Sequence, residues 1–413
     1  MDPLIAAAGR ALAAGDPLGA LKRVALREDP PALALRGVAM AQLGDFRRAT
    51  ALLRQAGRGF GVRDVAARAR CLVAEAEVAL VSHDSIWPVE VLDGARATLE
   101  AHGDFVNAAH ARQLAARHLV LIGRLDAAER TLAQLDPATL PPASSTAHEL
   151  LIAGIAMRRL RTRVARAALR RAGRAARRAQ IPALAAEVES AVALFNEPVA
   201  RMTRRRSERL LQLQDVEALL ASNGLVVDAC RSVVRRADTV ISLATRPVLF
   251  ALVRTLGEAW PGDAPRALLL QRAFGAKLAD DSHRGRLRVE MGRLRRVLRP
   301  VATVNATTRG FALMPRPCPG RRRGATDVVV LARPVEEAHA TVLALLADGE
   351  PWSSSALAQA LGASQRTVQR TLEVLAEAGK VQAFGAGRAR RWVTPPMPGF
   401  TSALLLSAPV PID

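Results

Sequence analysis

Residues 353–393 read SSSALAQALGASQRTVQRTLEVLAEAGKVQAFGAGRARRWV, and this stretch decides the fold that we expect. Leu357 and Leu361 lie four residues apart, which predicts one buried face on a first helix. Gly362-Ala363-Ser364 then interrupts that helix, because glycine readily takes the left-handed conformation that ends a helix. Ser364 is placed to cap a second helix, so the sequence predicts two helices joined by a tight turn.

The second helix has one apolar face and one polar face. Val368, Leu372 and Leu375 fall at i, i+4 and i+7 and predict its buried stripe. The opposite face carries side chains that form hydrogen bonds, namely Arg366, Gln369, Arg370 and Glu373. After this helix, Val381 to Phe384 leads to a glycine-rich tip and an arginine-rich strand returns, which predicts a β-hairpin.

This segment resembles the winged helix-turn-helix of bacterial transcriptional regulators at three sterically demanding positions. Ala358 is small where the helices cross, Gly362 permits the turn, and Val368 is β-branched on the buried side. By this resemblance the second helix enters a DNA major groove, and the hairpin contacts the backbone or the minor groove. The residues assigned to DNA in this way are Ser364, Gln365, Arg366, Gln369, Arg370, Arg388 and Arg390. The alternative is a domain that packs only against protein, although the core of such an interface is usually poor in charge.

The charge of the whole chain favours a polyanionic partner. The 413 residues carry a formal net charge of +21, and lysine occurs only as Lys22, Lys277 and Lys380. Nearly all of the positive charge is therefore arginine, which is suited to forked contacts with phosphate and guanine. An arginine bias can also follow from genomic base composition, as can abundant alanine and the lack of tyrosine. Charge alone therefore does not identify the partner.

Other classes of function find little support in the sequence. Cys71, Cys230 and Cys318 are far apart, which fits a reducing cytosol and predicts neither a disulfide framework nor a zinc site. The first residues lack the apolar run of a signal peptide, and no stretch reaches the roughly 18 apolar residues of a membrane span. We find no phosphate-binding glycine loop, nucleophile motif or paired metal ligands. We therefore expect a cytoplasmic protein that is not an enzyme, uses no cofactor or metal and does not enter a membrane.

Residues 1–200 show helical periodicity with few strand signals. Residues 41–49, AQLGDFRRA, are echoed by residues 121–128, LIGRLDAA. In both, a helix ends at glycine, a new helix starts at once, and alanine stands five residues after the glycine. Further units near Ser82 and Arg161 give a period of roughly 40 residues, and the region resembles a degenerate tetratricopeptide-repeat array, whose usual unit is about 34 residues. The resemblance implies stacked helix pairs with a groove for a peptide, protein or small ligand, and a scaffold for dimerisation or spacing is the alternative.

The segment from Arg158 to Arg178 holds ten arginines in 21 residues. Three interpretations of it stay open. It is a solvated helix face, it lies along the backbone of DNA, or it contacts an acidic partner domain.

Residues 201–222 are expected to form a linker helix, and residues 223–316 a domain of short strands, helices and a hairpin. The strands are predicted from runs rich in β-branched residues, at Leu225–Val227, Ser232–Arg235 and Thr239–Leu243. Helices are predicted from Pro247 to Trp260, from Arg266 to Phe274, and from the capping cluster Asp280-Asp281-Ser282 to the stop at Pro300. A hairpin around Thr307–Gly310 then closes the domain.

The helix that follows Asp280 is the most polarised of this domain. Its buried stripe is predicted at Leu287, Met291, Leu294 and Leu298. Its opposite face is predicted to hold Ser282, Gly285, Arg286, Val289, Gly292, Arg293 and Arg296. That face is narrow and basic, which suits a helix that enters a groove.

The element order, together with the runs DDSHRGRLRVEMGRLRRVL and TTRGFAL, resembles the effector domain of the OmpR/PhoB type of response regulator. The resemblance implies that this helix reads a major groove through Arg286, Val289, Arg293 and Arg296. It also implies that Arg309 in the hairpin reaches the minor groove and that the loop 275–280 faces RNA polymerase. Helical repeats stand where a receiver domain would precede it, so regulation by aspartyl phosphorylation is not expected.

The rest of the chain completes the expected domain order. Residues 317–333 are predicted as a stiff basic linker in which residues 327–331 are a candidate strand. Residues 334–394 form the C-terminal winged helix-turn-helix domain. Residues 395–413 are a tail that packs on a neighbour or makes a dimer contact.

The expected fold is mainly α with small β-hairpins and sheets, as an N-terminal α-solenoid followed by two winged-helix domains. The expected function is a sequence-specific transcriptional regulator that binds double-stranded DNA and whose helical repeats sense a ligand or form a homodimer. One alternative is a scaffold protein of a multi-subunit assembly, which the arginine-rich helix faces disfavour. The other is a plasmid or phage replication initiator, which the long repeat array fits poorly.

Overall fold

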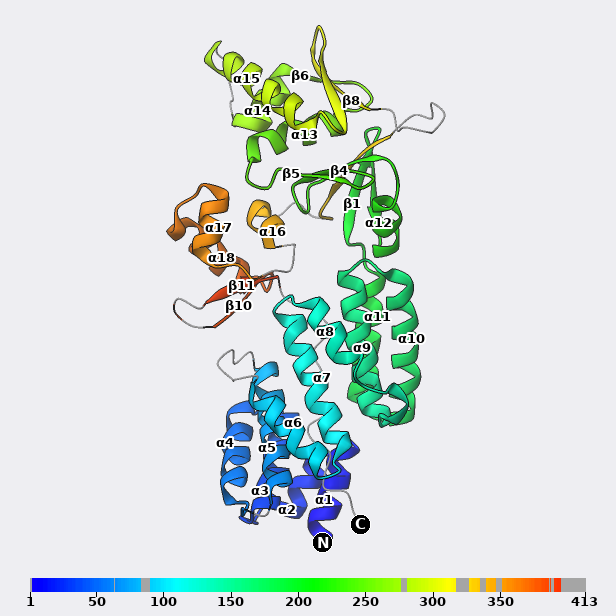
Figure 1. The fold of residues 1–413 in the computed structure, drawn as a ribbon, viewed down its shortest axis with the longest axis vertical. Helices are drawn as coiled ribbons and strands as arrows, with labels where there is room; N and C mark the ends of the chain where they lie inside the picture. Colours follow the sequence, from blue (N-terminus) through cyan, green and yellow to red (C-terminus); the bar gives the residue numbers. More distant parts are fainter. Residues whose placement is uncertain are drawn as a thin grey trace. The chain divides into compact units, whose positions relative to one another are not determined.

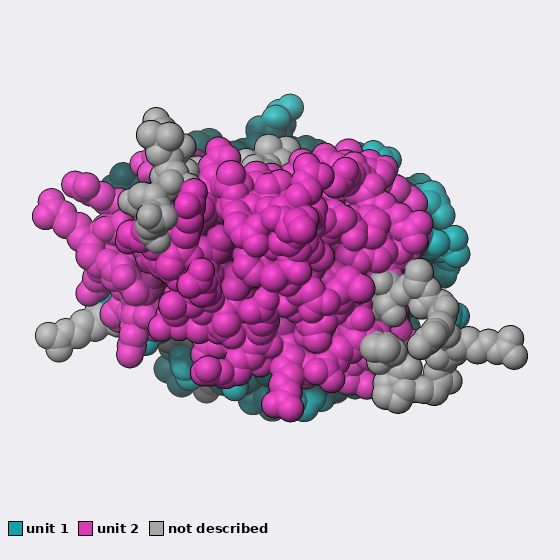
Figure 2. All heavy atoms as spheres, turned by 90° about the horizontal axis from the view of Figure 1, so that it is seen from above, with its two compact units in different colours: residues 1–195, 383–391, 395–413 teal, residues 196–382, 392–394 magenta. Residues whose placement is uncertain are grey.

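The computed structural model describes residues 2–62, 64–82, 90–275, 281–316, 327–334, 339–346, 351–385, 387 and 390–394. The chain divides into two compact units, which Figure 2 distinguishes by colour. Unit 1 is formed mainly by residues 1–195, and unit 2 mainly by residues 196–382 together with 392–394. The predicted tail 395–413 lies outside the described residues, as do residues 317–326 of the predicted basic linker and residues 276–280 of the loop assigned to RNA polymerase.

Unit 1 is built from helices that pack against their neighbours in the chain (Figure 1). The helices are α1 (Pro3–Ala13), α2 (Pro17–Val24), α3 (Pro30–Gln42), α4 (Phe46–Gly59), α5 (Val65–Val81), α6 (Glu90–Ala101), α7 (Phe105–Leu121), α8 (Leu125–Leu132), α9 (Pro142–Arg158), α10 (Thr162–Ala179) and α11 (Pro182–Asn196). A short 3-10 turn at Pro137–Thr139 precedes α9.

A local arrangement recurs at several turns of unit 1. Gly44 and Gly123 take positive φ angles of 87° and 80°, which a residue with a side chain rarely adopts. Five residues after each, Ala49 and Ala128 are fully buried where the helices approach. The turn between α9 and α10 repeats the pattern, with Leu160 at a φ of 54°. The glycine-to-alanine spacing noticed in the sequence therefore marks a real turn between packed helices.

Unit 2 combines short strands with helices. Its first part contains β1 (Ala200–Arg204), β2 (Ser207–Leu211), α12 (Leu213–Leu220), β3 (Leu225–Asp228), β4 (Val233–Arg236), β5 (Thr239–Ser242), α13 (Pro247–Ala259), β6 (Asp263–Pro265), α14 (Arg266–Phe274), α15 (Asp281–Leu298), β7 (Ala302–Ala306) and β8 (Gly310–Pro315). Then follow β9 (Val328–Ala332), α16 (Ala340–Leu346), α17 (Ser354–Leu361), α18 (Gln365–Glu377), β10 (Gln382–Phe384) and β11 (Arg391–Val393). Between residues 223 and 316 these elements follow the predicted order.

A six-stranded sheet in the order β2-β1-β9-β3-β4-β5 corrects one expectation and places another. Residues 201–211 were predicted within a linker helix but form the hairpin β1–β2, whose turn residues Arg205 and Arg206 both have positive φ angles. Residues 327–331 of the predicted linker were a candidate strand, and the structure has β9 there, which pairs with β1 and runs parallel to β3. Strand β1 is held by its pairing with β9 and by the ion pairs of Arg204 and Arg205 with Asp327, the residue before β9.

The expected fold class, mainly helical with small sheets, is confirmed. The core of unit 2 contains the predicted stripe of α15, of which Met291, Leu294 and Leu298 are fully buried. Helix α13 covers the sheet at Gly257, where an added Cβ would stand 2.8 Å from Val330 Cγ2. This close approach explains why a glycine occupies this position in the last turn of α13.

Among the described helices, none is both long enough and apolar enough to cross a membrane.

Candidate nucleic-acid interface

The turn between α17 and α18 is formed by the predicted residues. Gly362 ends α17 with a φ of 63°, and Ser364 precedes the first residue of α18. The Ser364 Oγ accepts a hydrogen bond of 3.1 Å from the backbone N–H of Thr367 and lies 2.8 Å from the Thr367 Oγ1. Ser364 therefore caps α18 by satisfying one of its unpaired backbone donors.

Helix α18 has the two faces that the sequence predicted. Val368, Leu372 and Leu375 are buried against the small domain that α16 and α17 complete. The exposed polar residues of its first three turns are Gln365, Arg366, Thr367, Gln369, Arg370 and Glu373, and Val374 is exposed beside them. The side chains assigned to DNA on this helix are thus brought together on one exposed face.

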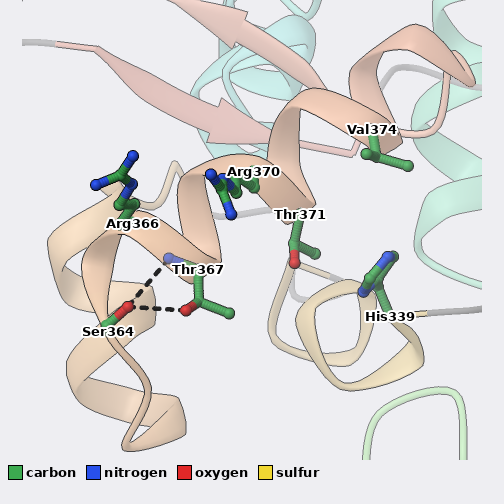
Figure 3. Close-up of a pocket in the computed structure, with 7 residues that line it drawn as sticks. All are labelled: His339, Ser364, Arg366, Thr367, Arg370, Thr371 and Val374. Carbon is green, nitrogen blue, oxygen red and sulfur yellow. Dashed lines mark hydrogen bonds between the residues drawn. The ribbon is translucent and has the colours of Figure 1, made fainter.

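Arg366 and Arg370 stand one turn apart beside a hollow of about 260 Å³ (Figure 3). His339, which precedes α16, and Thr371 and Val374 of α18 also line it. Gln365 is partly engaged within the domain, because its Nε2 donates to the Ser354 Oγ over 3.4 Å. The arginines are therefore the more available groups of this face.

The hairpin that follows α18 is anchored by a backbone bridge. Trp352 and Trp392 each donate their N–H to the other's carbonyl, over 2.9 and 2.8 Å. Their pairing places a third short segment beside the β10–β11 sheet. Arg390 is exposed on this hairpin, as predicted, whereas Arg388 lies outside the described residues.

Helix α15 of unit 2 presents a second polar face. Arg293 is 62% exposed, and its Nη1 donates to the Glu290 carboxylate over 2.8 Å. An exposed pair of this kind contributes little stability, so Arg293 is free to exchange that carboxylate for another acceptor. Arg296 is exposed and has no partner within the described part of the chain.

Of the other two predicted residues of α15, Arg286 makes a contact within the protein and Val289 is exposed to solvent. The guanidinium of Arg286 lies over the ring of Phe274 in α14, 4.7 Å from the ring centre. This cation–π contact holds the guanidinium at the surface between α14 and α15. Val289 is 55% exposed, which is unusual for valine and leaves its methyl groups available to a partner.

The hairpin β7–β8 is fixed by residues that sequence reasoning missed. Arg266 donates to the carbonyl oxygens of Thr308 and Thr307, over 2.9 and 3.1 Å. The Thr307 hydroxyl donates to the Asp263 carboxylate over 2.6 Å. Arg309 lies exposed at the tip that these contacts hold. No sequence signal could have found Arg266, because the carbonyl groups that it binds lie about 40 residues further along the chain.

The helices of unit 1 enclose a different kind of polar group. Glu77 of α5 accepts a hydrogen bond of 2.8 Å from His110 of α7, and both residues are buried. Desolvation lowers the pKa of the neighbouring Arg117 guanidinium, while Glu77 and Glu187 act in the opposite direction. These charged groups of α5, α7 and α11 add to the apolar contacts that α5 and α7 also make.

Further along the same interior, α7 and α9 contribute polar atoms that lack hydrogen-bond partners. The Gln113 Nε2 donates to the Ser144 carbonyl over 3.0 Å, but its Oε1 has no hydrogen bond. The Nδ1 of His148 and the Oε2 of Glu149 are likewise buried and unpaired. Burial lowers the pKa of His148 below its ordinary value, with Glu149 opposing that shift. Within the described ranges, no group of three or more histidine, cysteine, aspartate or glutamate side chains is arranged to hold a metal ion.

Comparison with known proteins bears on one part of the chain. A family model described as a helix-turn-helix domain matches residues 340–379, which span α16, α17 and α18. No curated protein and no solved structure gives a significant match to this chain. The chain therefore contains a helix-turn-helix domain, and that domain supports the binding of double-stranded DNA.

Proposed function

We propose that this protein is a sequence-specific transcriptional regulator that binds double-stranded DNA through two winged-helix domains. The observation that carries the proposal is the exposed polar face of α18, which lies within the helix-turn-helix match and holds Arg366, Gln369 and Arg370 opposite a buried apolar stripe. A helix of this kind reads base edges in the major groove through side chains near its start. The hairpin β10–β11 serves as its wing, with Arg390 on the DNA backbone or in the minor groove.

The second winged domain is the region of the six-stranded sheet, α13, α14, α15 and the hairpin β7–β8. Its likeness to OmpR/PhoB effector domains supports the assignment of α15 as a recognition helix, with Arg286, Val289, Arg293 and Arg296 facing DNA. The network of Arg266, Thr307 and Asp263 supports a wing that is fixed before binding. Two readers on one chain raise the affinity for a composite site through their effective concentration.

Unit 1 is proposed to regulate these readers. Its recurrent helix pairs fit a tetratricopeptide-like array, which offers a groove for a ligand or a surface for a homodimer. On this proposal the protein acts in the cytoplasm by binding rather than by catalysis, and contact with RNA polymerase remains a further expectation of the OmpR/PhoB likeness.

A scaffold role and a replication initiator are the competing functions. A scaffold would use α15 and α18 against protein, and the cores of protein interfaces are depleted in charge. The exposed arginines on both helices favour DNA instead. A replication initiator would also bind DNA, so only the sites that it selects and its effect on transcription separate it from a regulator.

The test is selection of bound duplexes from a random pool by the full chain, followed by binding titrations on preferred and random DNA. We expect Arg293→Ala to lose about 1–3 kcal/mol on the preferred sequence and to relax preference at one position. Arg10→Ala, which removes an exposed arginine of α1, is the charge-matched control. An equal loss on random DNA would reassign Arg293 to a backbone contact, and a chain that binds no duplex at low salt would refute DNA binding.

A further inference from the structure

The arginine-rich segment Arg158–Arg178 separates into two classes in the structure. In the first class, each guanidinium has a partner inside unit 1. Arg158 donates to the Val120 carbonyl over 2.7 Å, Arg159 pairs with Asp126, Arg161 donates to Glu129 over 2.9 Å, and Arg171 donates to Glu149 over 2.7 Å. Arg166 lies over the ring of Phe195, 5.6 Å from its centre. These arginines are explained by the packing of the helices.

The second class has no partner among the described residues. It comprises five exposed arginines of α10, namely Arg163, Arg170, Arg174, Arg177 and Arg178. At 100° per residue they fall within about 100° of arc and extend over about 22 Å of the helix. The buried alanines and Leu169 of α10 lie on the opposite side. We call these five residues the basic stripe.

A merely solvated face does not account well for the basic stripe. Residues 162–179 contain no aspartate or glutamate, whereas α6 and α8 mix both signs of charge. Arg170 and Arg174, and Arg174 and Arg178, are like charges one turn apart, and each such pair destabilises a helix by about 0.2–0.5 kcal/mol. The negative charges of a polyanion bound along the stripe would attract the guanidinium groups and offset the repulsion between them.

The surroundings of the stripe favour nucleic acid over an acidic protein. Protein interfaces are anchored by aromatic side chains and methionine in a core poor in charge. Between the arginines of the stripe stand no aromatic residue and no methionine, and the exposed uncharged residues there are Val164 and Ala167. At about 1.5 Å of rise per residue, successive arginines of the stripe are about 10.5, 6, 4.5 and 1.5 Å apart along the helix, so their charges form one row of unequal spacing. Phosphates with forked acceptor oxygens are the partner that this row of charges fits best.

We propose that the basic stripe of α10 binds the phosphate backbone of the double-stranded DNA that the winged helices read. This inference rests on the proposed function, to which it adds a contact that carries no sequence information. The stripe contributes affinity equally on preferred and random duplexes. Its contribution also weakens steeply with salt, because each phosphate contact releases condensed counterions.

The experiment compares full-length chains by binding titrations across a salt series. In the stripe variant, Arg170→Gln, Arg174→Gln and Arg177→Gln remove three charges and keep good helix-forming residues. The slope of log affinity against log salt should become shallower by about 0.9 for each of the three contacts, on preferred and random DNA alike. Arg47→Gln, Arg48→Gln and Arg58→Gln on α4 remove the same charge from exposed positions and should leave the slope unchanged. Thermal unfolding confirms that both triple variants fold.

The outcomes separate the two proposals. If the wild-type chain binds DNA and the stripe variant keeps the wild-type slope, the inference fails while the proposed function stands. If both triple variants show the same decrease in salt slope, the effect follows from net charge and not from the stripe, and the inference is also overturned. Polyglutamate serves as a model of an acidic protein partner. If the stripe variant binds polyglutamate less tightly than the wild-type chain but keeps the wild-type salt slope on DNA, the stripe binds acidic protein and the inference fails. If the wild-type chain binds no duplex, the proposed function fails and the inference falls with it.

Discussion

The two units of this protein fill their interiors in different ways. Unit 2 has a core of large aliphatic side chains from α13, α14, α15 and the sheets, with Leu252, Met291 and Leu294 fully buried. Unit 1 uses many buried alanines and also encloses Glu77, His110 and Glu187 between its helices.

This difference matches the roles that we propose for the units. A dense apolar core holds a recognition helix rigidly, because interiors packed in this way resist deformation. Alanine contacts and buried ion pairs stabilise less per residue, and the ion pairs depend on keeping every partner. The helical unit is therefore expected to respond more readily to a ligand, a partner or pH than the DNA-reading unit.

The largest expected effect is in the apolar core. Leu294→Ala should lower the free energy of unfolding of unit 2 by about 4 kcal/mol, because a fully buried leucine leaves a cavity that close-packed neighbours cannot fill. Hydrogen–deuterium exchange on α13 and α15 measures this loss separately from unit 1. Val289→Ala, on the exposed face of α15, should change stability by less than about 0.5 kcal/mol. Similar losses in both variants would mean that α15 is not packed as described.

The corresponding test of unit 1 removes one member of a buried pair. Glu77→Ala should cost about 3 kcal/mol, since it leaves His110 and the partly buried Arg117 without their carboxylate. Glu75→Ala is the matched control two residues away, because its partner Arg54 is 57% exposed and can turn to water. Exchange rates of α7 amides report both variants. A larger loss from Glu75→Ala would contradict the proposed difference between the two carboxylates.

A smaller effect tests how far unit 2 also depends on polar caps. Ser364→Ala should destabilise the start of α18 by about 1 kcal/mol, because the cap of the Thr367 N–H is lost. Exchange of the first-turn amides of α18 is the measurement. Ser355→Ala, which removes an exposed hydroxyl from α17, should leave α18 unaffected. If the α18 amides exchange at the wild-type rate in Ser364→Ala, the cap is not important for the helix.

The smallest expected effect is a dependence of unit 1 on pH. Burial lowers the folded-state pKa of His148 below the ordinary value of 6.5, so the unfolded chain takes up this proton first as pH falls. The stability of unit 1 should therefore be complete above pH 6.5 and decrease as pH falls below it. Exchange of α9 amides between pH 7.5 and 5, corrected for intrinsic rates, tests this. His148→Gln should flatten the profile and the exposed His102→Gln should not, while a profile that is flat in the wild-type protein would contradict the prediction.

Much of the candidate interface could be predicted because it depends on local patterns. The stripe of Val368, Leu372 and Leu375 and that of Leu287, Met291 and Leu294 follow from helical periodicity, which places every third or fourth residue on one face. Because Arg366 and Arg293 lie on the opposite faces of their helices, burial of the apolar stripes leaves both arginines exposed to solvent. The helix-turn-helix was predictable for the same reason, since Gly362 and Ser364 act through neighbours in sequence.

The incorrect expectation is the linker helix over residues 201–211, which form the hairpin β1–β2 instead. A strand was a candidate at residues 327–331, but only the structure shows that this strand, β9, pairs with β1 more than a hundred residues away. The position of Arg266 beneath the hairpin tip and the stacking of Arg286 on Phe274 were not foreseen either. Strand pairing and side-chain contacts of this kind depend on which surfaces meet after folding. A local sequence pattern does not determine which distant segments come into contact.

The sequence by itself determined the helical character of unit 1, the helix-turn-helix and the polar faces of α15 and α18, because turns, caps and periodicity act over a few residues. Only the tertiary structure decided which of the ten arginines between Arg158 and Arg178 have partners and which form the basic stripe. Tertiary packing also decided that Glu77 and His110 meet in the interior. The physical reason is that a charged side chain is paired or unpaired according to which groups lie near it in the folded protein. Packing brings those groups together from segments that are far apart in the sequence.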